Sequence, residues 1–157
     1  MKSSKIEVLL AFFISLILFV SVYFAFSDLF EFMLPKADNG YYSETDFFEH
    51  FRIALVFSLV FGLMPFFLLL IWRVTPIISK KQKMISILII LASITLSILV
   101  RQQMIRSYFS TMARGLNTAN EKFTVNYPIS KINFEFYLFI GLCIGCIISY
   151  SVFKQKK

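Results

Sequence analysis

The two cysteines of this 157-residue chain lie three positions apart, a spacing at which a pair of thiols can carry out redox chemistry. A membrane thiol oxidoreductase would pass electrons from Cys143 and Cys146 to a client protein through a second pair of thiols, and the sequence contains no other cysteine. The pair also falls several residues inside an apolar run, away from the positive charge that lowers a thiol pKa. We therefore expect both cysteines to be packing residues, and the oxidoreductase stays a third hypothesis.

Glu7 and His50 are single ionisable residues whose types suit ion transport or metal binding. Glu7 is the only acid inside an apolar run, but it follows Lys5 closely and can reach the membrane interface. His50 is the only histidine, with Asp46 one turn before it and Glu49 beside it. One imidazole among scattered carboxylates is more typical of a solvated helix start than of a metal site. We predict no metal, no cofactor and no catalytic residue.

Four nearly uninterrupted apolar runs must position these groups: Ile6–Phe26, Ile53–Trp72, Met84–Val100 and Phe136–Phe153. At 1.5 Å per residue each run extends roughly 25–32 Å, close to the ~30 Å hydrocarbon thickness of a bilayer. Backbone groups inside lipid need internal partners, and the runs lack the alternation of barrel strands, so they should be helices. The chain is 58% hydrophobic, which agrees with this reading. The sequence predicts an all-α integral membrane protein, a single four-helix domain over residues 1–157 with helices at about 6–34, 44–73, 83–114 and 136–153.

The distribution of basic residues predicts the orientation of these helices. The net charge is +7, but the basic residues flank the apolar runs and form no basic domain, so no nucleic-acid partner is expected. With both termini in the cytoplasm, the cytoplasmic side holds nine basic residues in three clusters against helix ends: Lys2, Lys5, Arg73, Lys80, Lys81, Lys83, Lys154, Lys156 and Lys157. Seven others lie outside. We predict a multi-pass protein of the cytoplasmic (inner) membrane with both termini inside.

Two long segments then face outward with opposite charge. Residues 27–50 contain six acids and one base, a net charge of −5, whereas residues 101–135 contain five bases and two acids, a net charge of +3. We expect the two extracytoplasmic loops to dock, with Asp46 and Glu49 opposite Arg101 and Arg106.

The second outer segment contains two patterns of secondary structure. Apolar residues from Met104 to Met112 recur at spacings of three and four, so this part either extends the third helix or lies along the membrane surface. Residues 123–127 and 132–136 alternate on either side of Pro128, which suggests a small hairpin.

Two small-residue features lie within the apolar runs. Gly62 and Pro65 fall in the middle of the second run, where proline removes a helical hydrogen bond and can produce a kink. Gly141, Gly145 and Ser149 recur every four residues, with Cys146 adjacent, and small residues at that spacing allow close approach of another helix.

These features favour a non-enzymatic integral membrane subunit or accessory protein. Its helices would associate with a larger membrane complex, and its outer loops would present a recognition surface. The expected partners are the lipid bilayer and a membrane protein or a second copy of the chain. A small oligomeric transporter or channel is the first alternative, and the membrane thiol oxidoreductase is the second.

Overall fold

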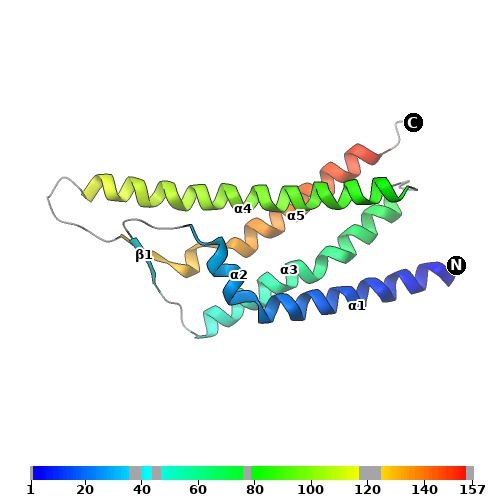
Figure 1. Ribbon diagram of the computed structural model, residues 1–157, viewed down its shortest axis with the longest axis horizontal. Coiled ribbons are helices and arrows are strands. Elements are labelled where there is room, and N and C mark those ends of the chain that lie inside the picture. Colours follow the sequence, from blue (N-terminus) through cyan, green and yellow to red (C-terminus); the bar gives the residue numbers. More distant parts are fainter. Residues whose placement is uncertain (1, 36–39, 44–46, 76–78, 117–124, 155–157) are drawn as a thin grey trace.

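Helices dominate the computed structural model, which describes residues 2–35, 40–43, 47–75, 79–116 and 125–154 (Figure 1). The elements, in chain order, are α1 (Lys2–Phe24), α2 (Phe26–Met33), β1 (Gly40–Ser43), α3 (Phe47–Val74), α4 (Lys80–Leu116), β2 (Val125–Pro128), the 3-10 turn Ile129–Lys131 and α5 (Phe134–Phe153). Four of the described helices, α1, α3, α4 and α5, are long and apolar enough to cross a membrane. The start of α3 expected near residue 44 falls on residues 44–46, outside the described residues.

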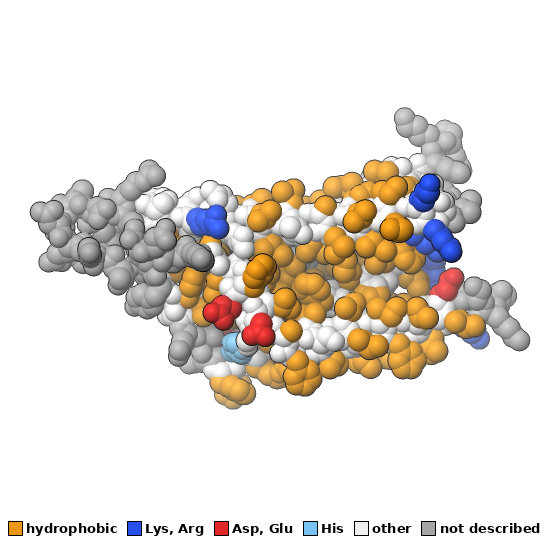
Figure 2. All heavy atoms as spheres, viewed as in Figure 1, with side chains coloured by type: hydrophobic (Ala, Val, Ile, Leu, Met, Phe, Trp, Pro, Cys, Tyr) orange, Lys and Arg blue, Asp and Glu red, His pale blue; other side chains and the backbone are white. Residues whose placement is uncertain are grey.

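The long helices form two packed pairs, α1 with α3 and α4 with α5, and contact between α3 and α5 joins the pairs. Both termini, the end of α3 and the start of α4 lie at one end of the bundle, here called the terminal end (Figure 1). The opposite end carries α2, β1, β2 and the 3-10 turn, together called the cap. Figure 2 shows apolar side chains along the middle of one face, with charged side chains gathered toward the two ends.

The expected continuous helix from 6 to 34 is wrong, because the chain breaks at Ala25 and α2 begins at Phe26. The break turns α2 over the end of the bundle, where Phe26, Phe30 and Met33 are buried. The Phe26 ring meets Phe57 at 5.4 Å and the Phe30 ring meets Phe134 at 5.6 Å. A straight helix would carry this apolar stripe away from the bundle, so burial of the aromatic rings favours the bend.

The helical pattern after Val100 belongs to α4 itself, which runs without interruption to Leu116. Ile105 and Phe109 are buried beneath the cap, whereas Arg106 on the same stretch is exposed. Of the two alternatives for this segment, the structure therefore has the extended helix.

The expected hairpin does not form within the described part of residues 123–136. β2 pairs with β1 in parallel, with Tyr42 opposite Tyr127, so the two segments predicted to be outer loops meet through backbone pairing. The segment 132–136, expected as the second strand, instead connects the 3-10 turn to α5 and forms the first residues of that helix. Asn133 adopts a left-handed conformation (φ 52°), which asparagine tolerates, and this turns the chain into the helix.

Candidate functional site

The small-residue stripe of α5 lies directly against α4. A Cβ atom on Gly141 would lie 2.7 Å from Ile94 Cα, and one on Gly145 would lie 2.7 Å from Ile90 Cα. One turn further, the buried hydroxyls of Ser149 and Ser86 form a hydrogen bond of 2.6 Å. The backbones therefore approach closer than any side chain at these two glycines would permit.

Both cysteines are free thiols that are half-buried on α5. Cys146 packs against the hydrophobic core next to the glycine stripe. The redox hypothesis stays untested by this placement.

Gly62 and Pro65 lie on α3, which is helical through both residues. A Cβ atom on Gly62 would lie 3.1 Å from Phe19 Cβ, so this glycine sits at the contact of α3 with α1. Pro65 is half-buried, and the kink expected there stays a prediction.

Two of the charged residues expected to join the two outer segments, Glu49 and Arg101, take other partners. Glu49 forms an ion pair with Arg52 of its own helix, 3.6 Å apart, and within the described residues it is paired with neither Arg101 nor Arg106. Asp46 lies outside the described residues. His50 lies edge-on to the Phe26 ring, 5.3 Å between centroids.

Arg101 organises the cap through its guanidinium group. Its Nε donates to the Ile132 carbonyl (2.7 Å), and its Nη2 donates to both the Lys131 carbonyl (2.5 Å) and the Tyr127 hydroxyl (3.1 Å). The guanidinium carbon also lies 5.2 Å from the centre of the Tyr137 ring. The planar fork of arginine suits such convergent acceptors, so this one side chain fixes the turn between β2 and α5. The neighbouring Gln102 donates to the Met33 carbonyl at 2.6 Å, which ties α4 to the end of α2.

An aromatic cluster holds β1 and β2 to the extended part of α4. The Tyr42 ring lies 5.6 Å from Phe109 and 6.4 Å from Tyr127, and Tyr127 lies 5.1 Å from Tyr108. The Tyr42 hydroxyl donates to the Pro35 carbonyl at 2.7 Å. Burial is the largest cause that raises the pKa of Tyr42 from 10.0 to about 12, and the nearby Tyr127 adds to it, while Arg106 acts in the opposite direction.

Stability of the cap is expected to fall as the pH rises from 10 to about 12. In this window the unfolded chain has released the Tyr42 proton while the folded chain retains it, so rising pH favours unfolding. Below pH 10 both states are protonated, and the contribution is fully present. Denaturation measured across this range should show a smaller fall for Tyr42→Phe than for the parent. Equal falls in both proteins would contradict the assignment.

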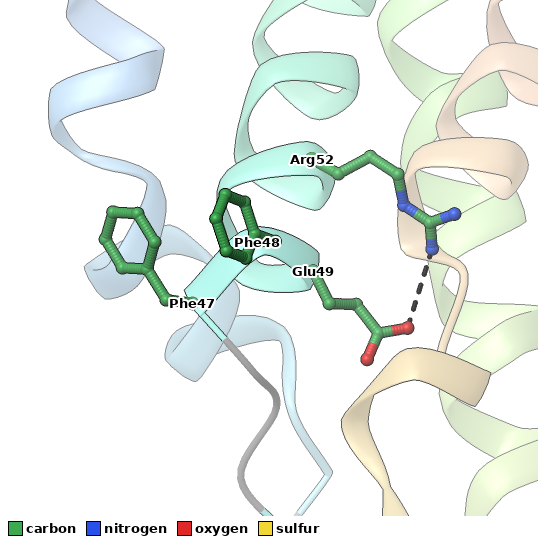
Figure 3. A pocket seen from close by; sticks show the side chains of 4 residues that line it. All are labelled: Phe47, Phe48, Glu49 and Arg52. Carbon is green, nitrogen blue, oxygen red and sulfur yellow. Dashed lines mark ion pairs between the residues drawn. The ribbon is translucent and has the colours of Figure 1, made fainter.

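The first turn of α3 presents two aromatic side chains at the edge of the cap (Figure 3). Phe47 and Phe48 are 78% and 83% exposed. Together with Glu49 and Arg52, which form an ion pair, these two residues line one open pocket at the start of α3 (Figure 3). The base of the cap therefore combines exposed apolar rings with a neighbouring charge pair.

A cavity of about 490 Å³ lies near the terminal end, between α1, α3 and α4. Most of its wall is apolar, but Glu7, Arg73 and Lys83 also line it, as does Trp72. The Lys83 ammonium lies 4.9 Å from the centre of the Trp72 ring. The Trp72 Nε1–H is buried and has no hydrogen-bond partner within the described structure.

No pattern in the sequence predicted this cavity, although Glu7 was singled out as the acid within the first apolar run. α4 packs mainly against α5 and makes little contact with α3. The space between α1, α3 and α4 depends on how these helices diverge, and no local pattern in the sequence reports that divergence.

Comparison with known proteins gives no match to this chain, whether with protein-family models, curated proteins or solved structures.

Proposed function

We propose that the chain is a non-enzymatic subunit or accessory protein of a membrane complex, and that its cap is the surface that recognises a partner. The cap itself is the observation that supports this proposal. Segments from both halves of the chain are joined there by the β1–β2 pairing and by the Arg101 hydrogen bonds. A built surface outside the apolar helices, with Phe47 and Phe48 exposed at its base, is suited to binding another protein.

The proposal places the protein in the cytoplasmic membrane with both termini in the cytoplasm. Supporting it are the four long apolar helices and the basic residues near the terminal end, which include Lys80 and Lys81. In a variant with both cysteines replaced by alanine, a cysteine at Thr111 is expected to react with an impermeant thiol reagent in intact cells. A cysteine at Lys81 should react only after the membrane is opened. The reverse pattern would overturn the orientation.

The partner role is tested by photo-crosslinking in the native membrane. A photoreactive amino acid at Phe47 or Phe48 should give one discrete protein adduct, while the same group at Ile147, exposed on α5, should give lipid adducts. Arg101→Met, which releases the turn between β2 and α5, should abolish the protein adduct although the chain remains inserted. An adduct that survives this change, or lipid adducts at all three positions, would contradict recognition by the cap.

The terminal cavity favours transport as a second candidate function, because it places the carboxylate of Glu7 beside an open apolar space. Proton movement coupled to a substrate in proteoliposomes, lost in Glu7→Gln, would support the transporter. The thiol oxidoreductase stays the third hypothesis, and a mixed disulfide trapped between Cys143 or Cys146 and a client would support it.

A further inference from the structure

We propose that the terminal cavity binds one phospholipid, with an acyl chain between α1, α3 and α4 and the phosphate held at the mouth by Arg73 and Lys83. This inference rests on the membrane placement proposed above. It assigns a ligand to a cavity that the recognition role of the cap does not use.

The dimensions of the cavity fit an acyl chain. Its wall on α1 runs from Glu7 to Leu18, a rise of about 16 Å at 1.5 Å per residue. Half of the ~30 Å hydrocarbon thickness is about 15 Å, so the wall is as long as the apolar part of one leaflet. The wall between these two residues is apolar and offers water too few partners, whereas an alkyl chain would bury its surface there.

The polar groups of the cavity gather at the end that would lie at the headgroups. Arg73 ends α3, Lys83 lies in the first turn of α4, and Glu7 lies near the start of α1. Two cations and one carboxylate give this mouth a net charge of +1, which suits the single negative charge of a phosphodiester. The buried Trp72 Nε1–H, which lacks an acceptor within the described structure, can donate to an oxygen of the headgroup or ester.

The charge balance further predicts which phospholipids bind best. A lipid with a net charge of −1, such as a phosphatidylglycerol, neutralises the mouth, whereas a zwitterionic phosphatidylcholine adds an ammonium beside Arg73 and Lys83. We therefore expect the cavity to prefer the anionic lipid. The carboxylate of Glu7 repels the lipid's negative charge and so reduces this preference.

Trp72 is the only tryptophan in the chain, so its fluorescence reports occupancy of this cavity. The full chain would be reconstituted in phosphatidylcholine, and phosphatidylglycerol with brominated acyl chains would be titrated in. The Trp72 fluorescence of each variant would be normalised to its value without brominated lipid. The relative binding constant over brominated phosphatidylcholine should fall about fivefold in Lys83→Gln, the effect of one basic residue near a membrane surface. It should rise in Glu7→Gln and stay unchanged in Lys81→Gln, a matched lysine outside the cavity.

A second pair of variants tests the acyl-chain part of the site. Ala11→Phe places a ring in the wall of the cavity and should reduce quenching by both lipids, whereas Ala92→Phe, on an exposed position of α4, should not. Equal affinity for both lipids, or Lys81→Gln acting as strongly as Lys83→Gln, would overturn the site in favour of general surface attraction. Displacement by inorganic phosphate would overturn the lipid as ligand. Absence of quenching by either lipid would overturn the membrane placement as well as this inference. Equal affinity for both lipids would overturn this inference alone, so the two failures are distinguishable.

Discussion

Gly145→Leu is expected to separate α5 from α4 and to destabilise the bundle by about 3 kcal/mol, at the upper end of the cost of overpacking. The reason is geometric, because even the first added carbon would lie 2.7 Å from Ile90 Cα, a backbone atom that cannot rotate away. Gly145→Ala should already show part of the loss. Thermal unfolding in detergent, followed by circular dichroism, measures both variants against the parent.

Ile147→Leu is the control for this prediction, since Ile147 lies two residues further along α5 and is 65% exposed. It should unfold at the temperature of the parent. If Gly145→Leu unfolds at a temperature no lower than that of this control, the close contact of α4 and α5 does not stabilise the fold.

Arg101→Met is expected to release the turn between β2 and α5 while leaving the four long helices folded. The substitution keeps an apolar side chain of similar length. It leaves the Ile132 carbonyl without its Arg101 donor and the Lys131 carbonyl with only the longer bond from the Tyr127 hydroxyl, at 3.4 Å. Hydrogen bonds to a charged group contribute about 1.5–3 kcal/mol, and Arg101 donates to three acceptors, so local opening should become easier by about 3 kcal/mol. Faster hydrogen exchange at Ile132, whose amide bonds to the Ile129 carbonyl, measures this effect.

Two variants show whether geometry or charge carries the effect of Arg101. Arg101→Lys keeps the charge but loses the planar fork, so it should restore only part of the protection. Arg106→Met removes an exposed arginine one turn or so along α4 and should leave exchange at Ile132 unchanged. Full rescue by lysine, or an equal effect at Arg106, would show that net positive charge is what holds the cap.

The apolar runs were sufficient to predict four long helices, because their length matches a bilayer and each run satisfies its own backbone hydrogen bonds. Spacing also indicated that Gly141 and Gly145 could admit a neighbouring helix, since side-chain size on one helix face is a local property. The identity of the helix that packs against this face could not be predicted from local sequence. The structure places α4 on that face, with Ser86 bonded to Ser149.

Charge patterns were a weaker guide to the outer segments. They suggested that the segments meet through Asp46 and Glu49 with Arg101 and Arg106. Within the described residues the contact consists of paired strands and aromatic rings, with Arg101 bound to backbone carbonyls. An exposed ion pair contributes little, so net charge did not select the partners, and burial of Tyr42 and Phe109 outweighed it.

The sequence by itself determined the number of long apolar helices, which follows from the apolar runs, and the placement of both termini at the same end of the bundle, which follows from an even number of such helices. Only the tertiary structure decided the bend at Ala25, the pairing of α4 with α5 and the cavity beside Trp72. Each of these depends on contacts between residues far apart in the chain. The energy of such contacts comes from surfaces that fit only after the helices have packed.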